Sequence, residues 1–354
     1  MPRLWKNKSQ GDFQEAEERM PGPLKAAVVG AAGIGKYHAQ WYAAEGCEVT
    51  AVVGTTPQSA AEAAENLKSL FGIQARGYHS LDEMLEREAP NCVSVCTPPD
   101  SHLEPVLKCL QAGVHVMCEK PLHWREDLDA NSILSGAKQM VDAAQSCGRI
   151  LAVNTQYTAA LEPFFAIYSR ERGQLERIES FLFEMESKGS RRGPNEYEDI
   201  WRELGPHALS LLLGALPYGK IDMNTLEAEM DRDYVNVRFR WVDGGAAPCD
   251  VTILTRCIRE GQPKRRFGIN GFVVDIGAVR EDGVYKTVLR HGESEVRWDD
   301  LVRISIRRFI AAVRGEAEPL VSAKDNIRNL EVQLQILQRL PGITPRSSSQ
   351  RQTG

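Results

Sequence analysis

Glycine residues near the start of the chain are spaced for phosphate binding. The segment from Val28 to Gly35 reads VVGAAGIG, a short apolar run that leads into a glycine-rich turn. A strand that enters such a turn and then a helix directs backbone N–H groups and a helix N-terminus at a pyrophosphate. In the GxGxxG register Gly30 makes the tight turn, Gly35 allows the helix to pack closely on the strand, and Ala32 takes the middle position. The motif alone also fits a tight turn that binds nothing.

The end of the second expected strand bears on the ribose of the cofactor. Folds that bind NAD usually carry Asp or Glu at this point, whereas this chain reads Gly54-Thr55-Thr56-Pro57. Without a carboxylate, the hydroxyl and N–H groups of Thr55 and Thr56 could bind a 2′-phosphate, although no arginine adjoins them. We therefore expect an NAD(P) cofactor, with NADP(H) slightly favoured over NAD(H). The alternative is a simple turn at 54–57.

A lysine follows a later strand of the same expected sheet. Ligands of open α/β sheets bind beyond the carboxyl ends of the strands, where the segments 97–102 (TPPDSH) and 118–121 (CEKP) lie. There the ammonium of Lys120 could hydrogen-bond a substrate oxygen and favour an alkoxide-like transition state. The competing interpretation of Lys120 is a surface lysine.

An imidazole in the second half of the chain could exchange the proton. If a helix begins at Pro206, its first turn presents His207, and Glu203 lies just before it. A carboxylate beside an imidazole orients the ring and raises its pKa, which suits proton exchange near neutral pH. A single histidine at a helix start is more often a surface or capping residue. The nucleotide motif and Lys120 shift the balance toward a catalytic His207.

The elements that must position these residues differ between the two halves of the chain. The first half alternates apolar strands (24–29, 49–53, 92–96, 115–118, 150–154) with helices (34–45, 59–71, 80–87, 103–112, 131–146). This pattern predicts a doubly wound parallel sheet with both faces covered. After a helix at 163–170, the second half shows period-two segments at 176–188, 224–229, 234–242, 249–257, 265–272 and 284–290, then helices at 301–314 and 323–340. Such alternation predicts a large, mostly antiparallel sheet.

The composition predicts the class of protein and its place in the cell. The chain has 354 residues with 43 Lys and Arg against 48 Asp and Glu, a formal charge of −5, and no run near the roughly 20 apolar residues that span a bilayer. Residues 1–23 lack the apolar core of a signal peptide. We expect a soluble cytoplasmic protein that binds neither nucleic acid nor membrane. Its eight cysteines form no CxxC pair and read as buried thiols, and its seven histidines show no metal-ligand spacing, so we expect no metal.

The combined motifs resemble the Gfo/Idh/MocA family, named for glucose-fructose oxidoreductase, inositol dehydrogenase and rhizopine catabolism. The resemblance spans about residues 24–340 and is carried by the 30–35 loop with Lys36 and His38, by Thr97-Pro98-Pro99 with His102, by Glu119-Lys120-Pro121, and by 203–207. It implies a Rossmann domain followed by a substrate-binding and oligomerisation domain, whose final helix packs back on the first domain. The change of pattern near residue 155 places these domains at 24–155 and 156–340, and the polar ends at 1–23 and 341–354 are expected to be flexible tails. The resemblance also implies pairing through the open sheet into a homodimer or homotetramer.

The resemblance and the strand ends together give a set of candidate site residues. The expected catalytic residues are Lys120, His207 and Glu203. The expected cofactor-binding residues are Gly30, Ala32, Gly33, Ile34, Gly35, Thr55, Thr56, Thr97, Pro98, His102, Glu119 and Lys120. The expected substrate-binding residues are Lys120, Asn154, Gln156, Tyr157, Trp201, Arg202 and His207.

Departures from the family pattern limit what the resemblance implies. Glu203 stands where Asp is usual, Ser210 replaces an acidic residue after the histidine, and Gln156 replaces a frequent arginine. The basic segments 188–192 and 264–266 hint at an anionic group, but a solvated loop is the favoured interpretation of both.

The leading hypothesis for function is an NAD(P)-dependent oxidoreductase acting on a carbinol or carbonyl carbon of a sugar, polyol or similar compound. An enzyme that cleaves or epimerises glycosides with redox-neutral turnover, and a nucleotide-binding regulator, remain as alternatives.

Overall fold

A computed structural model describes residues 22–188, 196–244, 247–281 and 283–339. The described residues therefore leave out most of the two expected tails. They also leave out Arg191 and Arg192 of the first basic segment. By its internal contacts the described chain forms two compact units. The N-terminal unit comprises 22–155 and 302–328, and the C-terminal unit comprises 156–301 and 329–339.

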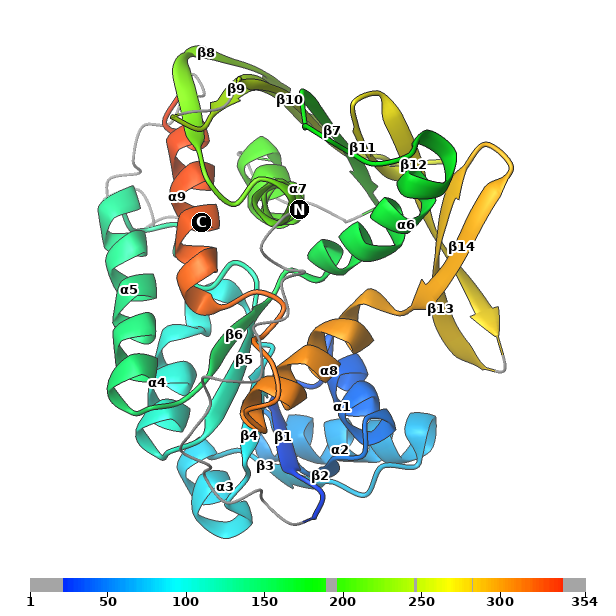
Figure 1. Cartoon of the computed structure of the whole chain (residues 1–354). Coiled ribbons are helices and arrows are strands. Elements are labelled where there is room, and N and C mark those ends of the chain that lie inside the picture. The colour runs from blue at the N-terminus through cyan, green and yellow to red at the C-terminus, as the bar shows by residue number, and fades with distance from the viewer. Residues whose placement is uncertain (1–21, 189–195, 245–246, 282, 340–354) are drawn as a thin grey trace. The chain divides into compact units, whose positions relative to one another are not determined.

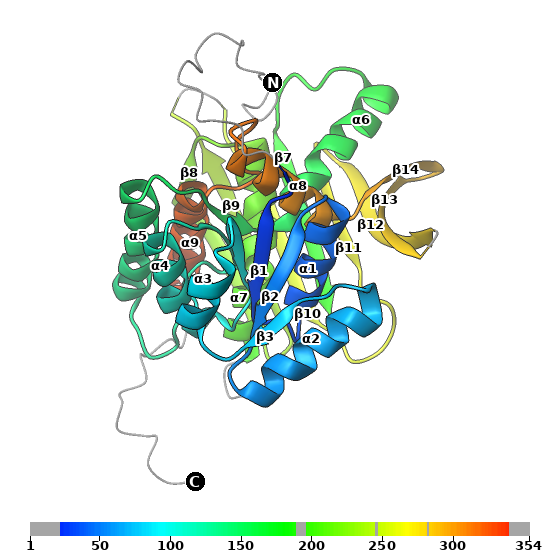
Figure 2. The same cartoon turned by 90° about the horizontal axis from the view of Figure 1, so that it is seen from below.

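The N-terminal unit is built on a six-stranded parallel sheet with the order β3-β2-β1-β4-β5-β6. Its strands are β1 (Lys25–Val29), β2 (Glu48–Val53), β3 (Arg76–Tyr78), β4 (Cys92–Val95), β5 (His115–Glu119) and β6 (Leu151–Asn154). Its helices are α1 (Gly35–Ala44), α2 (Pro57–Phe71), α3 (Leu81–Glu88), α4 (Leu103–Gln111), α5 (Ala130–Ser146) and α8 (Leu301–Val313), with a short 3₁₀ turn η2 (Pro99–Ser101). Helices α1 and α2 cover one face of the sheet, and α3, α4 and α5 cover the other (Figure 2). The order is that of the doubly wound Rossmann fold, as expected.

Local sequence explains why these helices begin where they do. Thr56 caps α2 in a reciprocal capping box with Ser59, Ser80 caps α3, and Asp129 caps α5. Each cap satisfies backbone N–H groups that a helix start leaves without a partner. Helix α1 differs, because Ile34 at its N-cap supplies no side-chain hydrogen bond. The first turn of α1 is thus left open to an anion.

A segment from far along the chain completes the N-terminal unit. Arg303 and Arg307 of α8 form ion pairs with Glu45, which follows α1, at 2.6 and 2.9 Å. Burial raises the pKa of Glu45, but hydrogen bonds and charge from the two arginines outweigh it and lower that pKa. Farther along the same segment, the carbonyl of Val321 accepts the N–H of Val153 in β6.

The C-terminal unit holds a second sheet, of eight strands in the order β14-β13-β12-β11-β7-β10-β9-β8. All its neighbouring pairs are antiparallel except β7 with β10. The strands are β7 (Ser180–Ser187), β8 (Lys220–Asp231), β9 (Tyr234–Val242), β10 (Cys249–Cys257), β11 (Arg265–Ile269), β12 (Phe272–Glu281), β13 (Val284–His291) and β14 (Ser294–Asp299). Helices α6 (Leu161–Arg172) and α7 (Glu196–Ala215) lie against one face of this curved sheet (Figure 1). A short 3₁₀ turn, η3 (Gln156–Ala160), leads into α6, and α9 (Ala323–Leu337) passes from one unit to the other.

An aromatic cluster joins α6 to this sheet. The ring of Phe164 on α6 lies 4.8 Å from that of Phe267 on β11 and 5.9 Å from that of Phe272 on β12. All three side chains are buried. The alternate apolar residues of the strands thus lie on the face of the sheet that the helices cover. The expected fold class, a Rossmann domain followed by a mostly antiparallel sheet, is confirmed.

Several local predictions were wrong. No helix begins at Pro206, because α7 starts at Glu196 and carries Pro206 in its interior. The segment expected as one strand at 265–272 is a hairpin whose turn, Asn270-Gly271, has both φ angles positive at 52° and 75°. An Asn-Gly pair is the strongest short-range signal for such a turn, so the sequence already favours a hairpin here. Arg265 and Arg266 begin β11, as the expected strand requires, so the interpretation of 264–266 as a solvated loop is wrong for these two residues.

The thiols and the hydropathy of the helices add two observations. All eight cysteines are free, and Cys96, Cys147 and Cys257 are only partly buried, so the expectation of buried thiols holds for the other five. Among the described residues, no helix combines the length and the apolar character that crossing a membrane would require.

Candidate active site

The glycine turn has the geometry that a dinucleotide site needs. Gly30 follows β1 with φ of +85°, and a Cβ placed on it would lie 2.9 Å from the carbonyl carbon of Cys96. A Cβ on Gly35 would lie 2.4 Å from the Gly30 carbonyl oxygen. Gly35 therefore lets α1 start directly against the turn, as expected from its register. Ala32, Gly33 and Ile34 are exposed above the uncapped start of α1, where a phosphate would approach.

The two threonines after β2 are not equivalent. The Thr56 hydroxyl accepts the Ser59 N–H at 3.1 Å, and the Thr56 N–H donates to the Ser59 hydroxyl at 3.0 Å. The polar groups of Thr56 are therefore used by the cap of α2. Thr55 is exposed and lies outside this capping box. Of the two, Thr55 is the residue with groups to offer a ribose or its phosphate.

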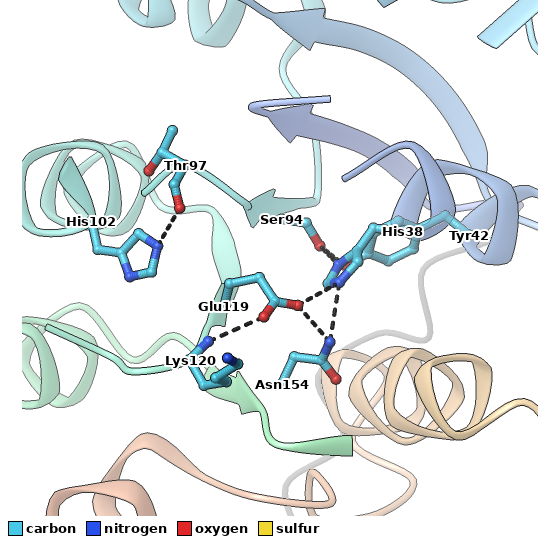
Figure 3. Close-up of polar contacts among 8 residues, drawn as sticks. All are labelled: His38, Tyr42, Ser94, Thr97, His102, Glu119, Lys120 and Asn154. Carbon is cyan, nitrogen blue, oxygen red and sulfur yellow. Dashed lines mark hydrogen bonds and ion pairs between the residues drawn. The ribbon is translucent and has the colours of Figure 1, made fainter. Parts of the chain in front are cut away.

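Glu119, at the end of β5, is the centre of a buried polar cluster (Figure 3). One carboxylate oxygen lies 3.0 Å from Nε2 of His38 and 2.6 Å from Nδ2 of Asn154. The other oxygen accepts the backbone N–H of Lys120 at 3.2 Å. Burial raises the pKa of Glu119, but the hydrogen bond and charge of His38, the hydrogen bond of Asn154 and the charge of Lys120 outweigh it and lower this pKa to about 2. Glu119 is thus a carboxylate at every pH at which the protein would be assayed.

His102 joins the two loops that follow β4 and β5. Its Nε2 lies 2.8 Å from the carbonyl oxygen of Thr97, a contact drawn as a dashed line in Figure 3, and its Nδ1 lies 3.1 and 3.2 Å from the carbonyl oxygens of Pro121 and Leu122. The ring is fully buried, and burial lowers its pKa although these carbonyls and the charge of Glu119 act in the opposite direction. His102 therefore fixes the loop of Thr97 and Pro98 to the loop that carries Lys120.

In the C-terminal unit, the candidate residues share one helix. Glu203 and His207 are four residues apart on α7, a spacing that brings side chains to the same face of a helix. Asp199 lies four residues earlier still and forms an ion pair with Arg202 at 2.7 Å. The loop-to-helix arrangement expected for Glu203 and His207 is thus replaced by a regular helical one. His207 is buried, whereas Glu203 and Arg202 are half-buried.

Tyr157 contacts His207 in the same unit. Their rings lie 4.8 Å apart at an angle of 59°. Burial raises the pKa of Tyr157, while the charge of Arg265 and its hydrogen bond to the phenol act against that rise. The structure thus brings together His207, Tyr157 and Arg265, of which Arg265 was not among the expected site residues. No sequence signal connects it with Tyr157, because 108 positions separate them.

Two residues expected to face a substrate have other tasks. Trp201 is fully buried, and its indole N–H donates to the carbonyl of Gln333 in α9 at 3.2 Å. Asn154 is fully buried and gives its amide N–H to Glu119. Gln156, another residue expected to contact the substrate, is half-buried at the start of η3. Of these, only Gln156 exposes polar atoms for a ligand.

Some residues of the polar cluster were missed. His38 was noted only within the family motif, and Ser94 and Tyr42 not at all, yet Ser94 lies 2.9 Å from Nδ1 of His38 and 3.0 Å from the hydroxyl of Tyr42. Polar residues inside otherwise apolar strands and helices are the signal that could have found them, since such groups are retained only with partners. Among the described residues, no group of three or more His, Cys, Asp or Glu is arranged to hold a metal.

The glycine turn and the strand order are those of a Rossmann dinucleotide-binding domain. Residues 24–155 match the GFO_IDH_MocA model, described as an oxidoreductase family with an NAD-binding Rossmann fold. Residues 24–155 are therefore similar to that family, in agreement with the resemblance drawn from the motifs.

Curated relatives include dehydrogenases of sugars and polyols. The chain is 33% identical over 142 residues to D-glucoside 3-dehydrogenase of Escherichia coli, and the match covers 40% of this chain and 37% of that protein. It is 30% identical over 131 residues to UDP-N-acetylglucosamine 3-dehydrogenase of Acidithiobacillus ferrooxidans, covering 37% and 38%. The matches thus span less than two fifths of the length of these two curated relatives.

Solved structures extend the likeness in fold to both units. The UDP-N-acetylglucosamine 3-dehydrogenase structure from A. ferrooxidans superposes with a TM-score of 0.66 at 20% identity, covering 89% of this chain and 96% of the other. A myo-inositol 2-dehydrogenase from Lactobacillus plantarum gives 0.67 at 15% identity, covering 89% and 96%. At these identities the likeness is one of fold.

Proposed function

We propose that this chain is an NAD(P)-dependent oxidoreductase that transfers hydride between the cofactor and a carbinol or carbonyl carbon of a sugar, polyol or related polyhydroxylated compound. The observation that carries the proposal is the glycine turn at Gly30 and Gly35 on the same sheet as Lys120. Both lie beyond the carboxyl ends of strands, where open α/β sheets bind ligands. The names of the curated relatives, sugar and polyol dehydrogenases, support the substrate class.

In the proposed mechanism the N-terminal unit holds the cofactor and the C-terminal unit supplies substrate contacts. A bound nicotinamide would supply the hydride donor or acceptor. The N–H groups of the turn at 30–35 would hold the pyrophosphate, and Lys120 would donate a hydrogen bond to the reacting oxygen, which stabilises its negative charge. His207, oriented by Glu203, takes or returns the hydroxyl proton. General acid–base help of this kind contributes about 10² to 10⁴ in rate.

We further propose a slight preference for NADP(H). Its support is the absence of a carboxylate at 54–56, together with the exposed position of Thr55 outside the capping box of α2. Fluorescence titration with NADH and NADPH compares the two affinities directly. For the substrate-binding unit we propose homo-oligomerisation through the sheet face that α6 and α7 leave uncovered, which light scattering on the purified protein tests.

Replacing Lys120 with Met tests the role of the ammonium. Turnover of a sugar or polyol substrate, found by screening with the preferred cofactor, should fall by about 10²-fold or more because the charged donor is lost. Cofactor affinity should remain within a few-fold. Lys108→Met is the matched control, since Lys108 is a surface lysine of the same unit that pairs with Asp82. Unchanged turnover in Lys120→Met would refute the role of Lys120.

The same assay distinguishes the main alternative. An oxidoreductase converts one cofactor molecule for each substrate molecule, so NADH or NADPH accumulates or disappears in step with product. A redox-neutral enzyme would form product without net change in the cofactor, and that result would replace the proposed reaction by a hydrolytic or epimerising one.

A further inference from the structure

The carboxylate of Glu119 is held by donors from several elements. His38 comes from α1, Asn154 from the end of β6, and the Lys120 N–H from the residue that follows β5. The side chains of His38 and Asn154 are fully buried, and Glu119 is 8% exposed. Three donors on a buried carboxylate leave it one orientation, because any rotation would break a charge-assisted hydrogen bond.

A chain of hydroxyl groups sets the proton on His38. Tyr42 is buried and neutral, since burial raises its pKa, so its O–H can donate to the Ser94 oxygen at 3.0 Å. The Ser94 O–H can then donate to Nδ1 of His38, 2.9 Å away. A proton on Nε2, present both in the neutral tautomer that accepts this bond and in the charged ring, points at Glu119. Each donor thus points toward the carboxylate.

We propose that His38, Glu119 and Asn154 form a positioning cluster that fixes the backbone of Lys120, so that none of the three is a ligand of cofactor or substrate. The inference rests on the proposed function, in which Lys120 touches the reacting oxygen. The Lys120 N–H donates a hydrogen bond to the Glu119 carboxylate, so the fixed carboxylate also holds the backbone of Lys120 in place. On the other side, His102 holds the carbonyls of Pro121 and Leu122.

The cluster also connects Lys120 with the phosphate-binding turn. His38 is the fourth residue of α1, the helix that begins at Gly35. The uncapped start of α1 and the backbone of Lys120 are therefore joined through two side chains. A shift of about 1 Å in a reacting group can cost on the order of 10²-fold in rate, so this connection bears directly on turnover.

An exchange of amide and carboxylate tests the cluster. Glu119→Gln removes the charge and sets its amide against that of Asn154, whereas Asn154→Asp places a second carboxylate 2.6 Å from the first. Each single change should lower kcat by about 10- to 100-fold, with the Kd for NADPH within about threefold. The double variant restores one carboxylate and one amide with their places exchanged. It should recover most of the lost kcat, the non-additivity expected of directly bonded partners.

A second measurement needs neither cofactor nor turnover. The backbone amide of Lys120 should exchange with deuterium at least tenfold faster in Glu119→Ala than in the wild type, because its acceptor is gone. Glu88→Gln is the control. Glu88 is another buried carboxylate of this unit, and it accepts a hydrogen bond from the hydroxyl of Tyr78 in β3. It can lower stability but should leave both the exchange of Lys120 and kcat unchanged.

The two measurements separate this inference from the proposed function. Unchanged amide exchange in Glu119→Ala, or no recovery in the double variant, would overturn the positioning cluster even if the enzyme is an active dehydrogenase. A weakened Kd for NADPH with normal kcat in Glu119→Gln would also overturn it, since Glu119 would then be a cofactor ligand. Faster exchange in a protein without dehydrogenase activity would support the cluster and refute the function.

Discussion

At the scale of single residues, burial separates groups that hold the site from groups that can touch a ligand. Glu119, His102 and Asn154 are polar side chains at strand ends or in the adjoining loops, yet each is buried with its hydrogen bonds directed into the protein. Lys120 and Thr55, in contrast, retain exposed surface. The chemistry assigned to a motif therefore belongs to only some of its members.

Acid titration offers a prediction for Glu119. Its pKa is lowered from 4.5 to about 2 in the folded protein, so its contribution to stability is present above pH 4.5 and is lost as the pH falls toward 2. The difference in unfolding free energy between wild type and Glu119→Gln should therefore shrink by about 2 kcal/mol between about pH 6 and pH 3. Urea unfolding at several pH values measures it. A difference that does not vary with pH would mean that Glu119 titrates normally.

Thr55 offers a second prediction at this scale. Thr55→Asp places a carboxylate where the 2′-phosphate of NADPH would lie, so NADPH affinity should fall about tenfold or more, equivalent to roughly 1.4 kcal/mol, while NADH affinity holds or improves. Titrations of both cofactors give the ratio. Gln74→Asp, at an exposed position beyond α2, controls for added surface charge. Equal loss for both cofactors would argue against a ribose contact at Thr55.

At the scale of elements, the β1–α1 unit depends on two residues without side chains. Gly35→Ala would bring a Cβ 2.4 Å from the Gly30 carbonyl oxygen, so the start of α1 must move. We expect cofactor affinity to fall at least about tenfold, with a loss of stability of about 1–3 kcal/mol from overpacking. Calorimetric titration and thermal unfolding measure the two effects. Gly244→Ala, where a Cβ would meet nothing within 4 Å, is the control. Normal affinity in Gly35→Ala would remove the turn from the cofactor site.

Helix α7 shows how one element can serve two purposes. Trp201 faces the core of the C-terminal unit, and its ring lies under Gly205, where a Cβ would come within 2.9 Å of it. Glu203 and His207 are spaced to share another stripe of the same helix. The helix accommodates Pro206 in its interior, and Asn329 donates to the Pro206 carbonyl at 2.9 Å. The packing that fixes α7 thus also fixes the imidazole.

At the scale of the whole molecule, the two units allow a test of where the cofactor binds. A ligand that binds only the folded state adds about 2.7 kcal/mol of stability at 100 times its Kd. We therefore expect NADPH to raise the unfolding temperature of the transition that includes the N-terminal unit. Scanning calorimetry of the wild type, with Gly35→Ala as the weak-binding comparison, measures this shift. A shift of the same size in Gly35→Ala would indicate that NADPH binds elsewhere.

The sequence by itself determined the fold class and the turn that faces a dinucleotide. Apolar strands with helical segments between them favour a parallel sheet covered on both faces, and the turn needs Gly30 for its positive φ and Gly35 for its contact with the Gly30 carbonyl oxygen, both local to β1 and α1. These features follow from short-range periodicity and sterics. They could therefore be predicted before any coordinates were known.

Only the tertiary structure decided which polar residues face inward. His38, Ser94, Glu119 and Asn154 come from four separate elements, and their hydrogen bonds exist only once the sheet has brought those elements together. The course of α7 through Pro206 was likewise not predicted, because packing along the helix outweighs the local tendency of proline to begin one. Burial and partnership depend on contacts between distant segments, and no pattern within one segment encodes them.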